Sequence, residues 1–301
     1  MAETRVLVTG AGGQLGRALR RAAWPEPVTL VAVRHDELDI ASPGDVDRAV
    51  SEGGFDAVVN AAAYTAVDDA ERDRDRAFAV NHLGALNMAR ACARNGAVLV
   101  HVSTDYVFDG AKPDPYVESD PINPASIYGR SKAAGEDAIR ASLDRHIILR
   151  TAWLFSAGRN NFVSRILQLA LQRPELAVVS DQVGNPTSAK DLASAIVHLL
   201  RGVLAREGGD GVAWGTYHCV NAEAASWHDL AQAAVDQAGP LLPCRPAIRP
   251  IPSVEYPQAA PRPANSRLNC ARLESAFGIR LRPWREALAP IVNEIVTELR
   301  P

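Results

Sequence analysis

Short apolar runs alternate with segments of helical periodicity through the first half of the chain. The apolar runs cover residues 5–9, 28–33, 57–60, 97–102 and 146–150. The segments with helical spacing are residues 14–23, 45–51, 75–95 and 131–143. Strands that alternate with helices at this spacing are typical of βαβ units, whose right-handed crossovers place helices on both faces of a parallel sheet. The pattern therefore predicts an α/β fold with a doubly wound parallel sheet of Rossmann type.

The second half of the chain has a different pattern. Helices are predicted over residues 162–171, 189–200, 227–238, 267–277 and 284–299, with a strand at 217–220. Residues 240–263 are rich in proline, which excludes a long helix there, and we expect them to wrap a smaller lobe. We predict a nucleotide-binding lobe over residues 1–153, to which segments near 187–222 return. Residues 154–301 are predicted to form mainly a substrate-binding lobe.

Composition excludes several classes of protein. The 301 residues are 47% hydrophobic and 22% charged, with a formal net charge of −3 and no long basic run, so no nucleic-acid partner is indicated. No apolar run approaches the length that spans a membrane, and no charged-then-apolar leader precedes the first strand. The cysteines, Cys92, Cys219, Cys244 and Cys270, are scattered without a CxxC pair. We therefore expect a cytoplasmic protein without a membrane partner, a disulfide framework or a zinc site.

A glycine-rich turn joins the first predicted strand to the first predicted helix. Gly10, Gly13 and Gly16 are spaced as GxxGxxG. Glycines at such a turn let the backbone approach a pyrophosphate, whose charge is favoured at the N-terminus of the following helix. A lone glycine pattern is weak evidence, but the strand before it and the helix after it favour a dinucleotide site over a simple turn.

Arg34 follows the second predicted strand, where enzymes specific for NAD often carry an acidic residue. An arginine there can pair with a 2′-phosphate, so NADPH is the favoured cofactor, with NADH still possible. The alternative is a solvated surface arginine. Asp39 and Ile40 lie a few residues further on, where the adenine would rest.

Tyr128 and Lys132 are four residues apart, so on a helix they share one face. An ammonium beside a phenol favours the phenolate, and we expect it to lower the pKa of Tyr128 so that the phenol can pass a proton to a carbonyl oxygen. Thr104 lies just past the end of the fourth predicted strand, where it can donate a hydrogen bond to the same oxygen. These residues predict carbonyl reduction with hydride from a nicotinamide, although YxxxK alone also occurs by chance on surface helices.

Several further segments resemble the dTDP-4-dehydrorhamnose reductase family, in order over nearly the whole chain. They are residues 60–68, 103–108, 128–132, 150–153, 181–187 and 262–268. The resemblance implies an extended short-chain dehydrogenase that reduces the 4-keto group of dTDP-4-dehydro-L-rhamnose with NADPH or NADH, giving dTDP-L-rhamnose. From the residues alone, the alanines after the third strand fit a backbone close to the cofactor and a buried turn equally well.

The resemblance also implies roles for single residues. Contacts to the cofactor are implied for Gly13, Gln14, Leu15, Asp39, Ile40, Ala63, Tyr64, Thr65, Val102, Tyr128 and Lys132. Contacts to the sugar nucleotide are implied for Thr104, Asp105 and Trp153. Some relatives dimerise through magnesium held by glutamates at the positions of Ala18 and Lys190. Because a neutral side chain and a cation cannot hold magnesium, we expect no structural metal and a monomer or weak homodimer.

Proteins with other functions share this predicted fold and are alternatives to a rhamnose reductase. Sugar-nucleotide dehydratases carry Thr-Asp-Glu where this chain has Thr104-Asp105-Tyr106, so the catalytic base of a dehydratase is missing. Epimerases retain tightly bound NAD, and Arg34, which favours NADPH, does not fit an epimerase well. A reductase of another dTDP-4-keto-6-deoxysugar fits the same motifs. A regulatory subunit that binds NADP without turnover would need the fold but not the complete set of Thr104, Tyr128 and Lys132.

Overall fold

The computed structural model describes residues 3–158, 161–206, 210–239, 242 and 245–299. Its centre is a sheet of six strands in the order β10-β5-β4-β3-β1-β2, with every neighbouring pair parallel. The strands are β1 (Thr4–Thr9), β2 (Val28–Val33), β3 (Ala57–Asn60), β4 (Val98–Thr104), β5 (His146–Thr151) and β10 (Gly215–His218). The predicted fold class is confirmed.

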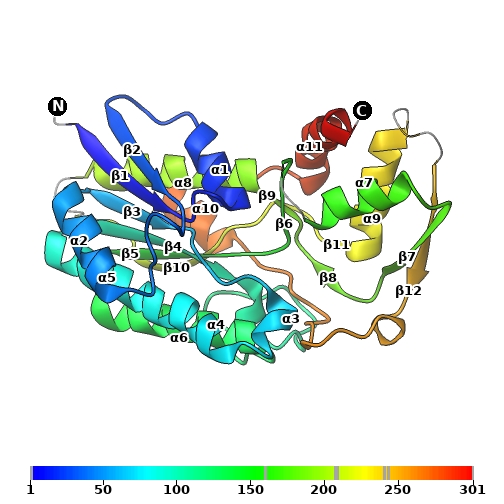
Figure 1. Ribbon diagram of the computed structural model, residues 1–301, viewed down its shortest axis with the longest axis horizontal. Helices are drawn as coiled ribbons and strands as arrows, with labels where there is room; N and C mark the ends of the chain where they lie inside the picture. Colours follow the sequence, from blue (N-terminus) through cyan, green and yellow to red (C-terminus); the bar gives the residue numbers. More distant parts are fainter. Residues whose placement is uncertain (1–2, 159–160, 207–209, 240–241, 243–244, 300–301) are drawn as a thin grey trace.

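Helices cover both faces of this sheet (Figure 1). One face carries α1 (Gln14–Arg21), α8 (Ala189–Leu204) and α10 (Ala271–Phe277), and the other carries α2 (Pro43–Gly53), α5 (Gly84–Asn95) and α6 (Ile127–Ser142). Val58 and Val59, adjacent in β3, are both fully buried, one in each of the two cores. Burial on both faces explains why these strands read as continuous apolar runs rather than as alternating patterns.

A smaller body lies beyond the carboxyl end of β5 (Figure 1). Its core joins α7 (Phe162–Ala170), α9 (Trp227–Ala238) and α11 (Trp284–Leu299). Its strands form three short pairs: β7 (Glu175–Val179) with β12 (Ala247–Ile251), β8 (Val183–Gly184) with β11 (Ala225–Ser226), and β6 (Leu154–Phe155) with β9 (Thr187–Ser188). β10, α8 and α10 come late in the sequence but pack on or in the large sheet.

Several predicted elements have different bounds in the structure. The helix predicted over 75–95 is α4 (Arg74–Phe78), a π-helical turn η1 (Ala79–Leu83) and then α5. The helix predicted from residue 267 begins only at Ala271, since Leu268 forms a bridge with Tyr116. The strand β12 was not predicted, because it lies in the proline-rich segment, part of which falls outside the described residues. The remaining short helices are α3 (Val67–Ala70), η2 (Asp105–Val107) and η5 (Ser253–Glu255).

Candidate functional site

A cleft of about 970 Å³ lies at the carboxyl ends of the sheet strands, between the sheet and the first turns of α7 and α9. This is the side on which open parallel sheets bind ligands. Most of the predicted site residues line the cleft: Gly10, Gly13, Gln14, Leu15, Arg34, Ile40, Ala63, Tyr64, Thr65, Val102, Thr104, Asp105, Tyr128, Lys132 and Trp153. Gly16 and Asp39 do not line it.

The glycines of the first turn have different tasks. Gly10 has a φ of +70°, and a Cβ atom there would lie 2.7 Å from the backbone of Ala61 and Ala62. Gly13 is the N-cap of α1, so the free N–H groups of the first helical turn face the cleft. A Cβ on Gly16 would lie 2.2 Å from the carbonyl oxygen of Gly10. Gly16 therefore lets the helix pack close beneath the turn, and this explains why it is absent from the lining.

Arg34 stands at the open end of the cleft, where its guanidinium donates to the Asp36 carboxylate over 3.0 and 2.8 Å. The hydrogen bond to Asp36 raises the pKa of Arg34, so the side chain is cationic throughout the physiological range. Its side chain is 56% exposed, which leaves it accessible to an anionic ligand. Asp39 instead accepts the backbone N–H of Ala41 over 3.0 Å and lies outside the lining.

Tyr128 lies in the first turn of α6, which begins four residues earlier than predicted because the Ser126 hydroxyl accepts the N–H of Gly129 over 3.1 Å. Burial raises the pKa of Tyr128 to about 12, although a hydrogen bond with the Thr104 side chain acts in the opposite direction. The predicted lowering of this pKa is wrong for the geometry observed. The physical reason is that burial of the phenol, aided by the nearby Asp105 charge, outweighs the hydrogen bond with Thr104.

Lys132 is fully buried, and its ammonium is held against β4. Nζ donates to the Val102 carbonyl over 2.7 Å and lies 3.0 Å from Nε2 of His101. Burial lowers the pKa of Lys132 to about 8, and the nearby Glu136 carboxylate only partly opposes this. Burial also lowers the pKa of His101, so its ring is neutral. His101 was not predicted as a site residue, and the available signal was a lone polar side chain within a buried strand.

Asp105 occupies the floor of the cleft beside Thr104. The Thr104 hydroxyl donates to Oδ1 of Asp105 over 2.9 Å, and burial raises the pKa of this carboxyl group to about 6. Among the residues that the structure describes, no group hydrogen-bonds to the buried Oδ2 atom. Asp105 itself lines the cleft, where its carboxyl group can meet a bound ligand.

The buried carboxylate of Glu136, on α6, is bonded to side chains of the two strands beneath the cleft. Arg150 donates to both of its oxygens, over 2.9 and 2.6 Å, and Ser103, the residue before Thr104, donates over 2.6 Å. Burial alone would raise the pKa of Glu136, but the Arg150 hydrogen bonds and charge hold it below its usual value. This ion pair ties α6, which carries Tyr128 and Lys132, to the adjacent strands β4 and β5.

The wall of the cleft opposite the glycine turn is aromatic. Trp153, two residues past the end of β5, stacks on Trp227 with ring centroids 3.5 Å apart and an interplanar angle of 6°. The Phe162 ring lies 4.6 Å from that of Trp227. Trp227 and Phe162 begin α9 and α7 and were not predicted as site residues. Nothing local in the sequence marks them, since only the tertiary fold brings them to Trp153.

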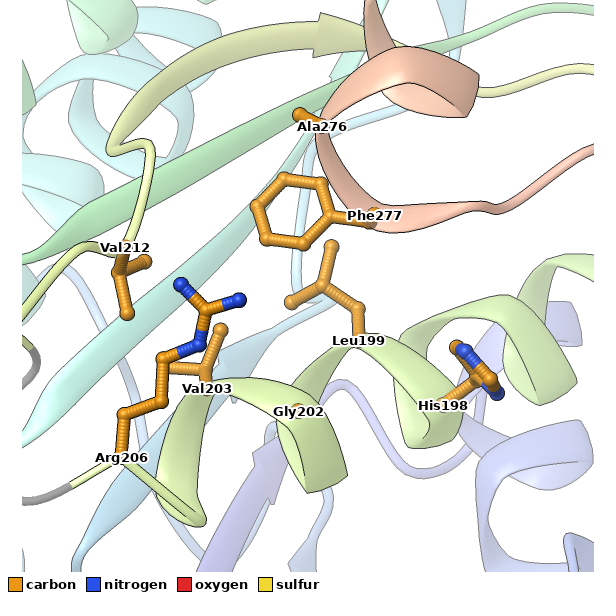
Figure 2. Close-up of a pocket in the computed structure, with 8 residues that line it drawn as sticks. All are labelled: His198, Leu199, Gly202, Val203, Arg206, Val212, Ala276 and Phe277. Atoms are coloured by element: carbon orange, nitrogen blue, oxygen red, sulfur yellow. The ribbon is translucent and has the colours of Figure 1, made fainter.

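A second cavity, of about 220 Å³, lies between α8 and α10 on the far face of the sheet (Figure 2). The figure shows the Phe277 ring above Leu199 and Val203, with the guanidinium of Arg206 beside them. None of the predicted site residues lines this cavity. Its lining is mostly apolar, and we assign it no chemistry.

Fold and site together define an oxidoreductase of the extended short-chain class, with a Rossmann-type sheet and a Tyr/Lys pair beside a glycine turn. A family model, described as the RmlD substrate binding domain, matches residues 4–297. The chain therefore belongs to the dTDP-4-dehydrorhamnose reductase family.

The relatives agree over nearly full length. A dTDP-4-dehydrorhamnose reductase from Sinorhizobium fredii is 41% identical over 294 residues, which are 98% of each chain. The spore coat polysaccharide biosynthesis protein SpsK of Bacillus subtilis is also 41% identical, over 97% of this chain and 98% of its own. A crystal structure of the Bacillus anthracis dTDP-4-dehydrorhamnose reductase in complex with NADP superimposes with a TM-score of 0.87. That protein is 34% identical, with 97% of this chain and 100% of the other covered.

In the part of the chain that the structure describes, no helix is both long and apolar enough to cross a membrane.

Proposed function

We propose that this chain reduces the 4-keto group of dTDP-4-dehydro-L-rhamnose with NADPH, giving dTDP-L-rhamnose. One observation carries the proposal: a single cleft is lined by the glycine turn, by Arg34 and by the group Thr104, Asp105, Tyr128 and Lys132. Relatives with about 40% identity over nearly the whole chain carry the name of this reductase.

The large body, built on residues 1–153 with α8, β10 and α10, binds the cofactor in this proposal, and the smaller body binds the sugar. Gly10 and Gly13 line the cleft at the N-terminus of α1, where the pyrophosphate binds. Arg34 faces the 2′-phosphate, and Ile40, Ala63, Tyr64, Thr65 and Val102 line the path toward the reaction centre. When bound, the nicotinamide supplies the hydride.

The chain's own residues supply the proton and hold the carbonyl. The Tyr128 hydroxyl donates its proton to the sugar's O4 as the carbonyl carbon accepts hydride, and Thr104 donates a hydrogen bond to the same oxygen. The ammonium of Lys132 stabilises the resulting phenolate through its positive charge. Asp105, which lines the cleft beside Thr104, accepts a sugar hydroxyl and fixes the orientation of the ring.

The test is a coupled assay with purified protein. The ketosugar is made in situ by the preceding dehydratase and 3,5-epimerase, and the loss of NADPH absorbance is followed. Oxidation that requires the epimerase, with dTDP-L-rhamnose as the product, supports the proposal. If the chain binds NADPH but oxidises none, it acts on another ketosugar or serves as a regulatory subunit. Copurified stoichiometric NAD would instead indicate an epimerase.

The preference for NADPH has a test of its own. Arg34→Asp removes the cation and places a carboxylate near the ribose, so it is expected to shift the ratio of kcat/KM for NADPH over NADH by at least about 10-fold toward NADH. The control is Arg48→Asp, because Arg48 is an exposed arginine on α2 outside the cleft. An unchanged ratio in the Arg34 variant would remove Arg34 from the cofactor site.

We further propose that the chain functions without a structural metal, as a monomer or weak homodimer. Ala18 and Lys190 occupy the positions at which some relatives carry glutamates, and neither side chain can ligate magnesium. Sedimentation analysis with and without magnesium tests this proposal. A tight dimer that EDTA dissociates would contradict it.

A further inference from the structure

The proposed proton and hydride transfers do not explain why two tryptophan rings are stacked on each other in one wall of the cleft. Trp153 is a non-glycine residue with a φ of +47°, a backbone conformation that is costly for a bulky side chain. Such a conformation persists only where the surroundings fix it. Here the Trp153 carbonyl accepts the N–H of Thr187 over 3.1 Å, and the indole lies against Gly184, where a Cβ would approach it to 2.6 Å.

Trp227 supplies the remaining support for that indole. It is the first residue of α9 and lies within the capping box formed by Ser226 and Asp229, so its backbone is fixed. Its Nε1–H donates to Oε1 of Gln182 over 3.1 Å, and Nε2 of Gln182 donates to Ser253 over 2.9 Å. The plane of the Trp227 ring is thereby held parallel to Trp153. Both rings line the cleft and are only partly buried.

The position of the wall indicates which part of a sugar nucleotide it meets. Thr151 of β5 is the register partner of Thr104 on β4, and neighbouring strands lie about 4.8 Å apart. Trp153 follows Thr151 by two residues, so the wall stands beside the reacting carbonyl. The base is separated from the sugar by a ribose and a diphosphate and therefore lies further away. A 6-deoxy sugar offers a methyl group and C–H bonds, which an indole face packs against favourably.

We propose that Trp227 is a specificity-determining residue: stacked on Trp153, it completes an aromatic wall that binds the apolar face of the 6-deoxy sugar. This inference rests on the proposed function. Gln182 acts as a positioning residue by holding the Trp227 ring in its plane.

The experiment compares Trp227→Leu, Trp227→Phe and Gln182→Met with a matched control, Trp214→Leu. Trp214 is partly buried against the core of the large sheet and does not line the cleft. Steady-state kinetics gives KM for the ketosugar and for NADPH. Calorimetry gives Kd for dTDP alone and for dTDP-L-rhamnose, a readout that does not depend on turnover.

For Trp227→Leu we expect KM for the ketosugar and Kd for dTDP-L-rhamnose to rise about 10-fold, with kcat changed by less than about 3-fold. Kd for dTDP and KM for NADPH are expected to stay within about 2-fold. Trp227→Phe keeps a flat ring and is expected to recover most of the loss, and Gln182→Met is expected to show a rise of about 3-fold. Trp214→Leu is expected to leave all four constants unchanged.

Equal weakening of dTDP and dTDP-L-rhamnose would place the wall at the base and overturn the inference. Unchanged constants in Trp227→Leu would overturn it as well. If Trp227→Leu fails to fold, Gln182→Met decides, since an unchanged Kd for dTDP-L-rhamnose in that variant would overturn the inference. Failure of the proposed function is distinguishable, because the wild-type protein would then not oxidise NADPH with the ketosugar.

Discussion

At the scale of single residues, the cleft combines a neutral phenol with a buried lysine whose charge is easily lost. Burial raises the pKa of Tyr128 to about 12 and lowers that of Lys132 to about 8. A phenol with a high pKa is a poor acid by itself. In the proposed reaction, proton transfer would therefore depend on the charge of Lys132 and on the hydrogen bond with Thr104 to stabilise the phenolate that forms.

Tyr128→Phe removes the proton donor and leaves the ring in place. We expect kcat to fall at least about 100-fold, the lower range for loss of a general acid, while the Kd for NADPH changes little. Single-turnover hydride transfer and calorimetry measure the two quantities. Tyr106→Phe is the control, because the Tyr106 ring lies 5.5 Å from that of Tyr128 and contacts the same region. Near-normal turnover in Tyr128→Phe would exclude Tyr128 as the acid.

The pKa of Lys132 is expected to set the pH above which activity falls. This pKa is lowered by burial to about 8. Because the proposed mechanism requires the protonated form, kcat/KM for NADPH is expected to be level below about pH 7 and to fall above about pH 8. Lys132→Arg retains a positive charge at all accessible pH values and is expected to remove this alkaline limb even where its activity is low. If kcat/KM instead fell only near the ordinary pKa of a lysine, the ammonium would not be desolvated during turnover.

At the scale of elements, the sequence predicts best where local pattern and tertiary environment agree. The sheet strands are buried on both faces and so appear as unbroken apolar runs. The glycine turn is recognisable from the spacing of its glycines between a strand and a helix. The break at η1 has no such signal, because it arises where Asn81 bonds both the N–H and the carbonyl of Tyr64 and the hydroxyl of Ser131. The roles of His101 and Trp227 likewise depend on partners far away in the sequence.

The close contact between α1 and the glycine turn gives a prediction for stability. In Gly16→Ala, the new Cβ would lie 2.2 Å from a backbone carbonyl oxygen, so we expect a loss of about 1–3 kcal/mol in the free energy of unfolding and weaker NADPH binding. Gly12→Ala is the matched control, since its Cβ would meet only the Arg34 side chain, at 3.8 Å. Urea denaturation measures both. Equal stability of the two variants would mean that the turn relaxes without strain.

At the scale of the whole molecule, the free energy of unfolding depends on pH, because buried histidines and a buried aspartate have shifted pKa values in the folded state. Burial lowers the pKa of His101 well below its usual value and brings that of His218 to about 3, so the folded protein keeps these two rings neutral, and burial lowers the pKa of His146 in the same direction. The unfolded chain binds a proton at each of them below about pH 6.5. Asp105 acts in the opposite direction, because its pKa of about 6 makes the folded state retain a proton that the unfolded chain has released.

Between about pH 6 and pH 5 the unfolded chain therefore binds at least about one proton more than the folded chain: His101 and His218 contribute two, and Asp105 offsets one. Stability is lost as pH falls, and the free energy of unfolding is expected to drop by at least about 1.4 kcal/mol per pH unit. Urea denaturation at about pH 7.5, 6 and 5 measures this slope. His218→Gln removes one titrating ring and is expected to make the slope shallower by about one proton. A flat profile in the wild type would mean that His101 and His218 accept protons without unfolding.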